Sequence, residues 1–463
     1  MIIQNKCYLC IIETMISIPL SEYNELKTLI AELSEKIKKL EEKNSLQRNG
    51  KDSNKSSTPP SQDIGRSNKK NLRFKSGLKS GGQLGHEGFT LKMKEDPDEI
   101  IEYKPDYCCS CGADLQQVES QVNENKQEVI IPSIRARYIE HRSHTKICPC
   151  CNNTCKGYLP DHLKAPIQYG SSVSTVVSYL SVYQYMPYHR ISLMFNDIFG
   201  IPISEGSIDN MLESSMQKAL PAYGVIQQKI QQCEVVGSDE TGCHINGKKG
   251  WFHTWQNTLL TFIVASLNRG YQTIETYFPN GFPQSVYVSD CWAAQLKTNA
   301  LHHQLCIVHL LRDLSNFEDA LSCTWSKEMK LLFQQAIELK HKLIESDYNQ
   351  PHQMIMQFED KLESLLNVDY TNKHPKVKAF IKRLIKNKNS IFTFLHFHNV
   401  PADNNGSERA IRNVKVKTKV SGQFRAERGA KRFAVLRSVI DTSIKNSQNV
   451  FQALTALENL VPS

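Results

Sequence analysis

The chain has 463 residues, of which 40% are hydrophobic and 22% are charged. This is more than one domain normally holds, and the composition is ordinary for a protein that buries a core, so we expect two or three folded units. Lys and Arg outnumber Asp and Glu by 56 to 47, a small excess that is informative only where it concentrates. No apolar run of about 18 residues occurs, which excludes a spanning helix and predicts no membrane partner.

The first segment is apolar but carries Lys6 and Glu13 and lacks the cleavage pattern of a secretory signal. We expect residues 1–19 to be an unstructured extension ahead of a start at Met15. Residues 20–47 then carry apolar side chains in steps of four and three, the seam of a coiled coil, at Leu26, Ile30, Leu33, Ile37 and Leu40. We favour a self-association helix that makes a homo-oligomer; an ordinary amphipathic helix is the alternative.

Residues 48–90 are predicted to be a basic linker that ends in a glycine-rich motif, GGQLGHEGF. Lys, Arg, Ser, Asn, Gly and Pro dominate, and such a polar segment cannot bury enough apolar surface to fold alone. Its positive charge suits DNA phosphates, although a merely solvated tether is the alternative. The candidate phosphate contacts here are Lys69, Lys70, Arg73 and Lys75.

Residues 91–160 hold seven cysteines with paired spacing, which is typical of a metal site rather than a disulfide framework. Two C-x-x-C pairs can each present two thiolates to one tetrahedral, structural Zn²⁺, and these pairs are Cys108 with Cys111 and Cys148 with Cys151. The neighbouring cysteines leave the ligand choice open, because any of three could substitute: Cys109, Cys150 and Cys155. A redox role and a set of free thiols are weaker alternatives. Cysteine usage of this kind predicts a cytoplasmic protein.

Residues 161–232 read as three helices, the last two joined by a short turn around Gly200 and Pro202. This is the outline of a helix-turn-helix, which either reads DNA or only packs.

Three acids stand apart in the remainder: Asp239 and Asp290, each after a predicted strand, and Glu408 at a helix start. Strand ends are where active sites collect, and three converging carboxylates repel one another unless cations lie between them. Hard oxygen ligands suit Mg²⁺ or Mn²⁺, and two such ions could clamp a phosphodiester. Taken singly, each acid is as well explained as a helix cap or a surface charge.

At these residues the chain resembles the bacterial insertion sequence 66 transposases, a branch of the DDE transposases with a ribonuclease-H-like catalytic fold. The resemblance covers nearly the whole chain, from the heptads to the last helix. Its motifs are GGQLGHEGF, YCCSCGADL, CPCC, SDETG, VSDCWAAQL, QLCIVHLLRDL and VPADNNGSERAIRNVKVKTKVSGQF, of which the last is the most specific.

The resemblance implies that Asp239, Asp290 and Glu408 are the three catalytic acids. They would hold two divalent ions, Mg²⁺ or Mn²⁺, during cleavage at transposon ends and joining of the freed 3′-hydroxyl to target DNA. Cys306 and His309 have the C-x-x-H spacing of related transposases and are expected to be architectural; a second zinc site is the alternative. Two departures are the cysteine-rich CPCC and the absence of a tryptophan before His309.

The resemblance also implies a multidomain α/β architecture. A catalytic core over residues 233–324 and 398–463 would be ribonuclease-H-like, with a mixed sheet and a helical insertion at 325–397. Basic residues after Glu408 are candidate DNA contacts, with solvated charges as the alternative: Arg409, Arg412, Lys415, Lys417 and Lys419.

We therefore expect a bacterial transposase, cytoplasmic and associated with the nucleoid when it is bound to double-stranded DNA. Other proteins encoded by the same mobile element are expected as further partners. One alternative is a non-enzymatic zinc-module DNA-binding regulator, which leaves the three acids without a role. The other is a ribonuclease-H-like nuclease that hydrolyses DNA without joining it.

Overall fold

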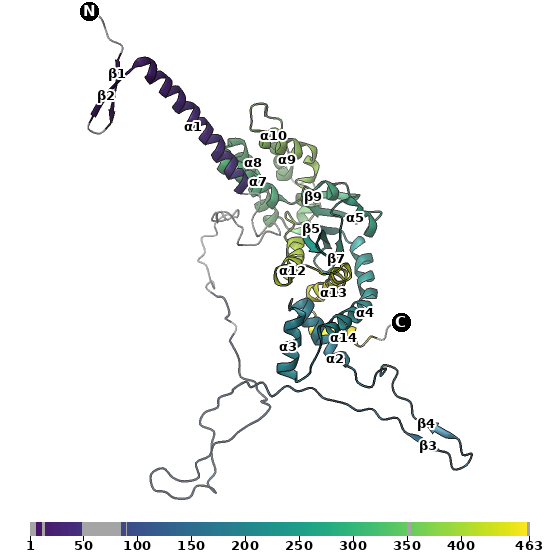
Figure 1. Ribbon diagram of the computed structural model, residues 1–463. Helices are drawn as coiled ribbons and strands as arrows, with labels where there is room; N and C mark the ends of the chain where they lie inside the picture. Colours follow the sequence, from purple (N-terminus) through teal and green to yellow (C-terminus); the bar gives the residue numbers. More distant parts are fainter. Residues whose placement is uncertain (1–5, 12–13, 49–84, 89, 350–352, 461–463) are drawn as a thin grey trace, which may run out of the picture.

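A computed structural model describes residues 6–11, 14–48, 85–88, 90–349 and 353–460 of the chain. The central element is a mixed sheet of five strands in the order β7-β6-β5-β8-β9 (Figure 1). β5, β6 and β7 pair antiparallel, whereas β8 and β9 run parallel to β5. The strands are β5 Val235–Ile245, β6 Lys248–Gln256, β7 Thr261–Ser266, β8 Phe282–Ser289 and β9 Ala300–Leu305.

A tight turn joins the first two strands of this sheet, at an Asn-Gly pair that is typical of a two-residue hairpin. Asn246 and Gly247 connect β5 to β6 with φ angles of 50° and 72°. Asn and Gly tolerate these left-handed values, which match the twist of a two-residue hairpin.

Most of the remaining described chain is helical, as the sequence predicts. Before the sheet lie α2 Ser171–Ser178, the π-helix η2 Tyr179–Tyr183, α3 Tyr188–Phe199 and α4 Glu205–Gln231. Within the sheet region lie α5 Tyr271–Tyr277, α6 Ala293–Leu296 and α7 Ile307–Leu321. After α7 come α8 Thr324–Lys342, η3 Glu345–Asn349, α9 Gln353–Leu366, α10 Pro375–Lys386, η4 Lys388–Ser390 and α11 Thr393–His396. The chain closes with α12 Asn405–Ser421, α13 Glu427–Lys445 and α14 Val450–Glu458.

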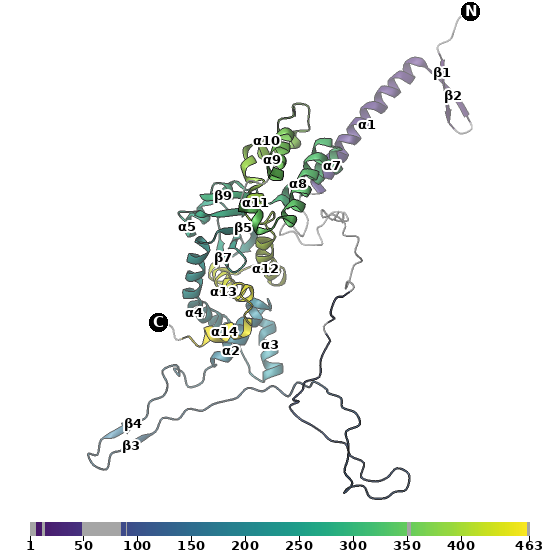
Figure 2. The ribbon, with the colours of Figure 1, turned by 180° about the vertical axis from the view of Figure 1, so that it is seen from behind.

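The two faces of the sheet pack against different helices, because side chains along a strand alternate between faces. Phe252 and Ile263 join a core built with α4, α12 and α13. Trp255 and Phe262 join a second core, built with α5 and the last turns of α4. Figure 2 shows the sheet from behind, with α12 and α13 lying next to it.

The helical insertion predicted at 325–397 forms a core of its own with the edge of the sheet. Trp325, Phe333 and Phe380 are buried there together with Val288 of β8 and Leu305 of β9. The insertion helices lie at one end of the molecule and α2, α3 and α14 at the other (Figure 1).

The N-terminal region differs from its prediction. The sequence analysis expected no structure in residues 1–19, but β1 Lys6–Ile11 and β2 Thr14–Pro19 pair antiparallel, with Ile11 opposite Thr14. Residues rich in Tyr, Ile and Thr favour strands, and this preference outweighed the lack of any turn signal. The following helix, α1 Leu20–Arg48, is confirmed as a helix.

Among the residues that the structure describes, no helix is both long and apolar enough for a membrane crossing.

Candidate active site

Asp239 and Asp290 lie near each other because of how β5 and β8 pair. β5 pairs with β8 only as far as Gly237, whose partner is Val288. Asp239 and Asp290 each lie two residues further along, so both side chains point to the same face of the sheet. Asp290 directly follows β8, as predicted, but Asp239 lies inside β5 rather than after it, because β6 continues to pair with β5 as far as Ile245.

Glu408 reaches these two acids from the first turn of α12. The start of α12 lies against β5 so closely that two positions have no space for a Cβ atom. A Cβ on Gly237 would lie 2.6 Å from Ser407 Oγ, and a Cβ on Gly406 would lie 2.6 Å from Gln256 Nε2. These glycines therefore permit the approach that places Glu408 beside the sheet.

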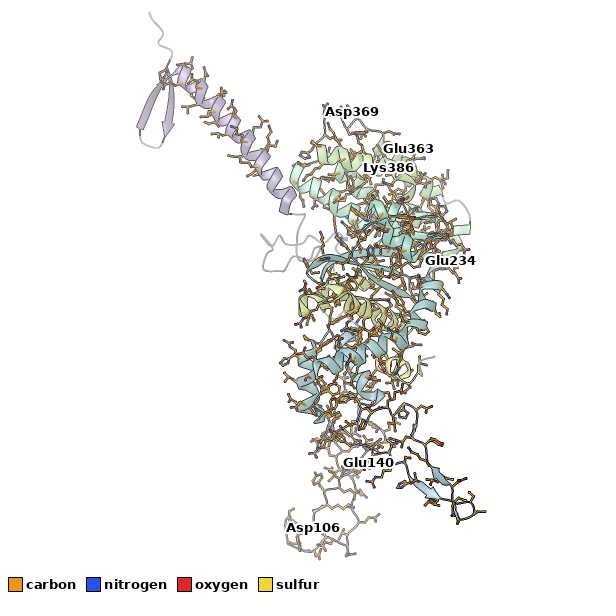
Figure 3. All side chains as sticks on the ribbon, turned by 45° about the vertical axis from the view of Figure 1, so that its right-hand side comes forward. Asp106, Glu140, Glu234, Glu363, Asp369 and Lys386 are labelled. Carbon is orange, nitrogen blue, oxygen red and sulfur yellow. The ribbon has the colours of Figure 1, made fainter. Side chains whose placement is uncertain are left out.

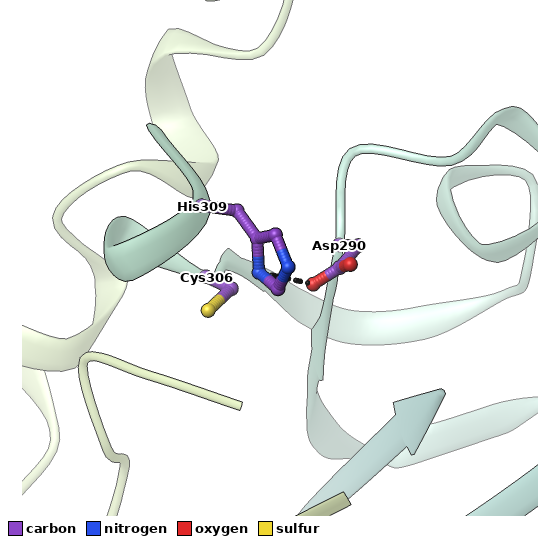
Figure 4. Close-up of side chains that lie close together, drawn as sticks. All are labelled: Asp290, Cys306 and His309. Atoms are coloured by element: carbon purple, nitrogen blue, oxygen red, sulfur yellow. Dashed lines mark ion pairs between the residues drawn. The ribbon is translucent and has the colours of Figure 1, made fainter. Parts of the chain in front are cut away.

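His309 of α7 lies between two of the acids. Its Nδ1 is 2.9 Å from Asp290 Oδ1, and its Nε2 is 3.6 Å from Glu408 Oε1. Figure 4 shows the imidazole directed at Asp290, with Cys306 beside it. Burial lowers the pKa of His309, but hydrogen bonds with Asp290 and Cys306 outweigh it and raise the pKa to about 10. The contact with Asp290 thus favours the protonated ring, whose charge offsets that of the acids around it.

Asp239 shares the electrostatic environment of this site. Burial raises its pKa well above the usual aspartate value, and the charges of Asp290 and Glu240 raise it further. The Glu240 N–H donates to Asp239 Oδ1 at 2.8 Å and works in the opposite direction, as does His309. The carboxylates around Asp239 therefore repel one another.

The donor atoms at this site fit a divalent cation. Asp290 Oδ1 and Glu408 Oε1 are buried, and both lie beside His309. Asp290, Cys306 and His309 also offer ligand atoms within 4.8 Å of one another, the one group of three or more such residues in the described part of the chain. Carboxylate oxygens are hard ligands of the kind that Mg²⁺ and Mn²⁺ prefer.

Asn404 joins the segments that carry Asp239, Glu408 and His309, and it was not predicted from the sequence. Its Nδ2 donates to Ser238 O at 2.6 Å, beside Asp239, and its Oδ1 accepts from Ser407 Oγ at 2.6 Å, beside Glu408. Its backbone N–H donates to Cys306 Sγ at 3.2 Å. Asn404 is 2% exposed. The signal was present in the NNGSER motif, but an asparagine beside a glycine is more typical of a turn.

Two other residues complete the surroundings of His309. Cys306 is buried, and its thiol accepts the Asn404 N–H, which agrees with the architectural role expected of it. Arg312, also missed from the sequence, brings Nη1 to 3.6 Å from Glu408 Oε1 and 3.0 Å from His309 Nε2. Its place one turn after His309 on α7 was the available signal.

The basic residues after Glu408 do not share one surface. Arg409, Arg412 and Lys419 are exposed on α12, and Lys415 is half-buried. Lys417 differs from its predicted surface position, since its Nζ donates to Ser181 O at 3.4 Å and burial lowers its pKa to about 8. The predicted linker contacts lie outside the described residues: Lys69, Lys70, Arg73 and Lys75.

The two cysteine pairs form similar turns but do not meet in the structure. Cys108 N–H donates to Ala113 O, and Cys148 N–H donates to Asn153 O. Backbone N–H groups of the following residues, with Cys111 and Cys151 the largest contributors, lower the pKa of Cys108 and Cys148. Figure 3 places Asp106, just before the first pair, at a loop tip away from the hairpin of β3 Thr145–Ile147 and β4 Thr154–Lys156. One zinc ion held by both pairs stays a prediction.

The comparisons with known proteins agree with this architecture. The model of the family described as "Transposase IS66 family" matches residues 166–432, more than half of the chain and all three acids. The chain belongs to this transposase family. The comparison with curated proteins found no match.

Family membership gives the protein a role in transposition and makes DNA its partner. The match is shorter than the resemblance described from sequence. The heptad helix, the linker and the cysteine module of this transposase all precede residue 166 and lie outside the match, as does α14.

Proposed function

We propose that this transposase cuts DNA at transposon ends and joins the freed 3′-hydroxyl to target DNA, with Asp239, Asp290 and Glu408 as the catalytic acids. The observation that carries the proposal is the convergence of buried carboxylates in one place: Asp290 and Glu408 lie on either side of His309, and the charges of Asp290 and His309 act on Asp239.

The proposed site would take two divalent ions, Mg²⁺ or Mn²⁺, on these carboxylates. Ions bound there would neutralise the scissile phosphate and activate the attacking water or hydroxyl. In their absence His309 and Arg312 balance the acids, at 2.9 Å from Asp290 and 3.6 Å from Glu408 respectively. Asn404 would hold the segments of Asp239, Glu408 and His309 in position, which matters because in-line displacement depends on positioning.

The strand order supports a ribonuclease-H-like core. Three antiparallel strands come first in the chain, and two strands parallel to the first of them follow. This arrangement places the first acid on the central strand and the second directly after its parallel neighbour. The exposed Arg409, Arg412 and Lys419 beside Glu408 would contact the DNA backbone.

The test uses the full chain with labelled duplexes that carry the element's terminal repeats and a plasmid target. We expect the native protein with Mg²⁺ to give nicked ends and joined products. Asp290→Asn should bind the ends but cleave at least about a hundredfold more slowly, because it loses charge stabilisation of the phosphate. Asp197→Asn, an exposed position on α3, is the matched control and should cleave normally.

Two outcomes would contradict the proposal in different ways. If Asp290→Asn behaved like the native protein in every assay, the regulator without catalysis would be the better interpretation. If ends were cut but no joined product formed under any target condition, the protein would be a nuclease of the same fold.

A further inference from the structure

A ladder of alternating cations and aromatic rings runs along the sheet beside the proposed catalytic acids. Lys249 Nζ lies 5.0 Å from the ring centroid of Trp251. The Arg269 guanidinium lies 4.8 Å from the same ring and 3.9 Å from the ring of Trp292. Each of these contacts lies within the range of a cation–π interaction, so Arg269 is held between two indoles.

The central arginine of this ladder is fixed by the residue that follows Asp239. Arg269 donates to Glu240 Oε1 from Nε at 3.2 Å and from Nη2 at 2.8 Å. Glu240 Oε2 accepts from Gln295 Nε2 at 2.7 Å, and the Glu240 side chain is only 8% exposed. Because Glu240 and Asp239 are neighbours on β5, their side chains point to opposite faces of the sheet.

The other end of the ladder is fixed by the segment after Asp290. The backbone N–H of Trp292 donates to the backbone carbonyl of Asp290 at 2.8 Å. The indole and the carboxylate therefore belong to one turn of the chain. Trp292 is therefore the ring of the ladder that lies next to an acid, whereas Trp251 and Arg269 lie on the opposite face of the sheet with Glu240.

Trp292 is much more exposed than Trp255 and Trp325. Trp255 and Trp325 are 0% and 4% exposed, and their indole N–H groups donate to Tyr287 Oη and Leu365 O. Trp292 is 37% exposed, although Arg269 stacks on its ring. A rigid, exposed aromatic ring backed by a cation is a surface on which bases of unpaired nucleotides stack.

We propose that Trp292, backed by Arg269, binds an unpaired nucleobase next to the scissile phosphate. The base would be extruded from the duplex or exposed at its cut end, and stacking on the indole would hold the phosphate at the acids. This inference rests on the proposed function, since it assumes that DNA is cut at these acids.

The first test measures stacking without cleavage. The full chain carrying Asp290→Asn is mixed with terminal-repeat duplexes that have 5-iodouracil at single positions around the cleavage site, and is irradiated. We expect one position to crosslink to the peptide that contains Trp292. Crosslinking that is spread evenly over positions, or that never reaches this peptide, would overturn the proposal whether or not the native protein cuts DNA.

The second test compares Trp292→Ala with the native protein on an intact duplex and on one with an abasic site at the crosslinked position. Stacking of one base predicts roughly 5- to 150-fold weaker binding of the intact duplex by the variant. It also predicts almost no difference between the two proteins on the abasic duplex. An equal loss on both duplexes would show that Trp292 only supports the fold.

Two further variants serve as controls for this comparison. Trp292→Phe retains a ring and should recover part of the binding lost in Trp292→Ala, so a defect in folding can be separated from a defect in stacking. Phe451→Ala removes an aromatic ring of similar exposure on α14 and should bind both duplexes as the native protein does. If the native protein binds and crosslinks as expected but cuts no DNA, the proposed function fails while the stacking site stands.

Discussion

Asn404 connects more segments of the proposed site by hydrogen bonds than the other site residues described above. Its side-chain amide forms hydrogen bonds with Ser238 on β5 and Ser407 on α12. Its backbone N–H donates a hydrogen bond to the Cys306 thiol at the start of α7. The residues that follow or lie near each partner are Asp239, Glu408 and His309. One buried amide therefore relates three segments that are far apart in the sequence.

We predict that Asn404→Ala destabilises the protein by about 1–3 kcal/mol, because it leaves Ser238 O buried without a donor. Cleavage should fall by more than the loss of folded protein explains, since the acids lose their common support. Urea unfolding and single-turnover cleavage at a temperature where the variant is folded measure the two effects. Asn405→Ala is the control, because the Asn405 side chain bonds only Asp403 nearby. Equal losses in both variants would contradict the prediction.

His309 gives the metal-free protein a defined dependence on pH. Burial lowers the pKa of His309, but the contacts with Asp290 and Cys306 outweigh burial and raise the folded-state pKa to about 10. A histidine in the unfolded chain has a pKa of about 6.5. The raised value means that the pairing stabilises the fold fully below pH 6.5 and is lost as pH rises toward 10.

We therefore predict that, in EDTA, His309→Gln lowers the free energy of unfolding more at pH 6 than at pH 9.5. Urea unfolding of the native protein and the variant at both pH values measures this difference. In a background of Asp290→Asn the pH dependence should shrink, because the carboxylate that favours the charged ring is gone. A difference that is independent of pH in both backgrounds would exclude the ion pair.

At the scale of single elements, α1 contacts α7 but leaves an apolar stripe exposed. The five seam residues are between 48% and 62% exposed: Leu26, Ile30, Leu33, Ile37 and Leu40. The helix itself was predictable, because its residues are good helix formers with a regular apolar repeat. Its partner was not, since a heptad seam needs a second helix that one chain does not supply.

We predict that Ile30→Lys converts an oligomer of the full chain to a smaller species. A lysine in the seam would be buried against the partner helix without a counter-charge. Light scattering after gel filtration measures the mass. Leu29→Lys is the matched control, because Leu29 is 52% exposed on the same helix but lies off the seam. If both variants kept the native mass, α1 would not hold the oligomer together.

Neither lysine substitution should affect the folded core. Both positions are exposed, so each should change the free energy of unfolding by no more than about 0.5 kcal/mol. A large loss of stability in either would mean that α1 packs on its own chain in solution.

At the scale of the whole molecule, the sheet and the helical insertion explain how distant acids meet. The chain leaves the sheet after β9, builds a separate core from α7 to α11, and returns with the backbone N–H of Ile307 bonded to Ala402 O. α12 then begins beside β5. The long excursion between Asp290 and Glu408 is tolerated because its own buried side chains stabilise it.

Several features were predictable from the sequence because they depend on local patterns. The helices after residue 170, the Asn246-Gly247 hairpin and the acid-bearing blocks all follow from periodicity, turn chemistry or motif. The pairing of β1 with β2 was not predicted, because the sequence between the two strands carries no turn signal. The inward Lys417 was not predicted either, since the identity of a lysine does not reveal the element that packs over it.

The sequence alone determined which residues are candidates for the site and which family they resemble, because short-range patterns and side-chain chemistry do not depend on tertiary contacts. Only the tertiary structure decided how they are combined. It brought His309 between Asp290 and Glu408, assigned Asn404 to three segments at once, and placed Arg269 between Trp251 and Trp292. These contacts join residues far apart in sequence, and they form only when strand pairing and core packing have fixed the positions of every element.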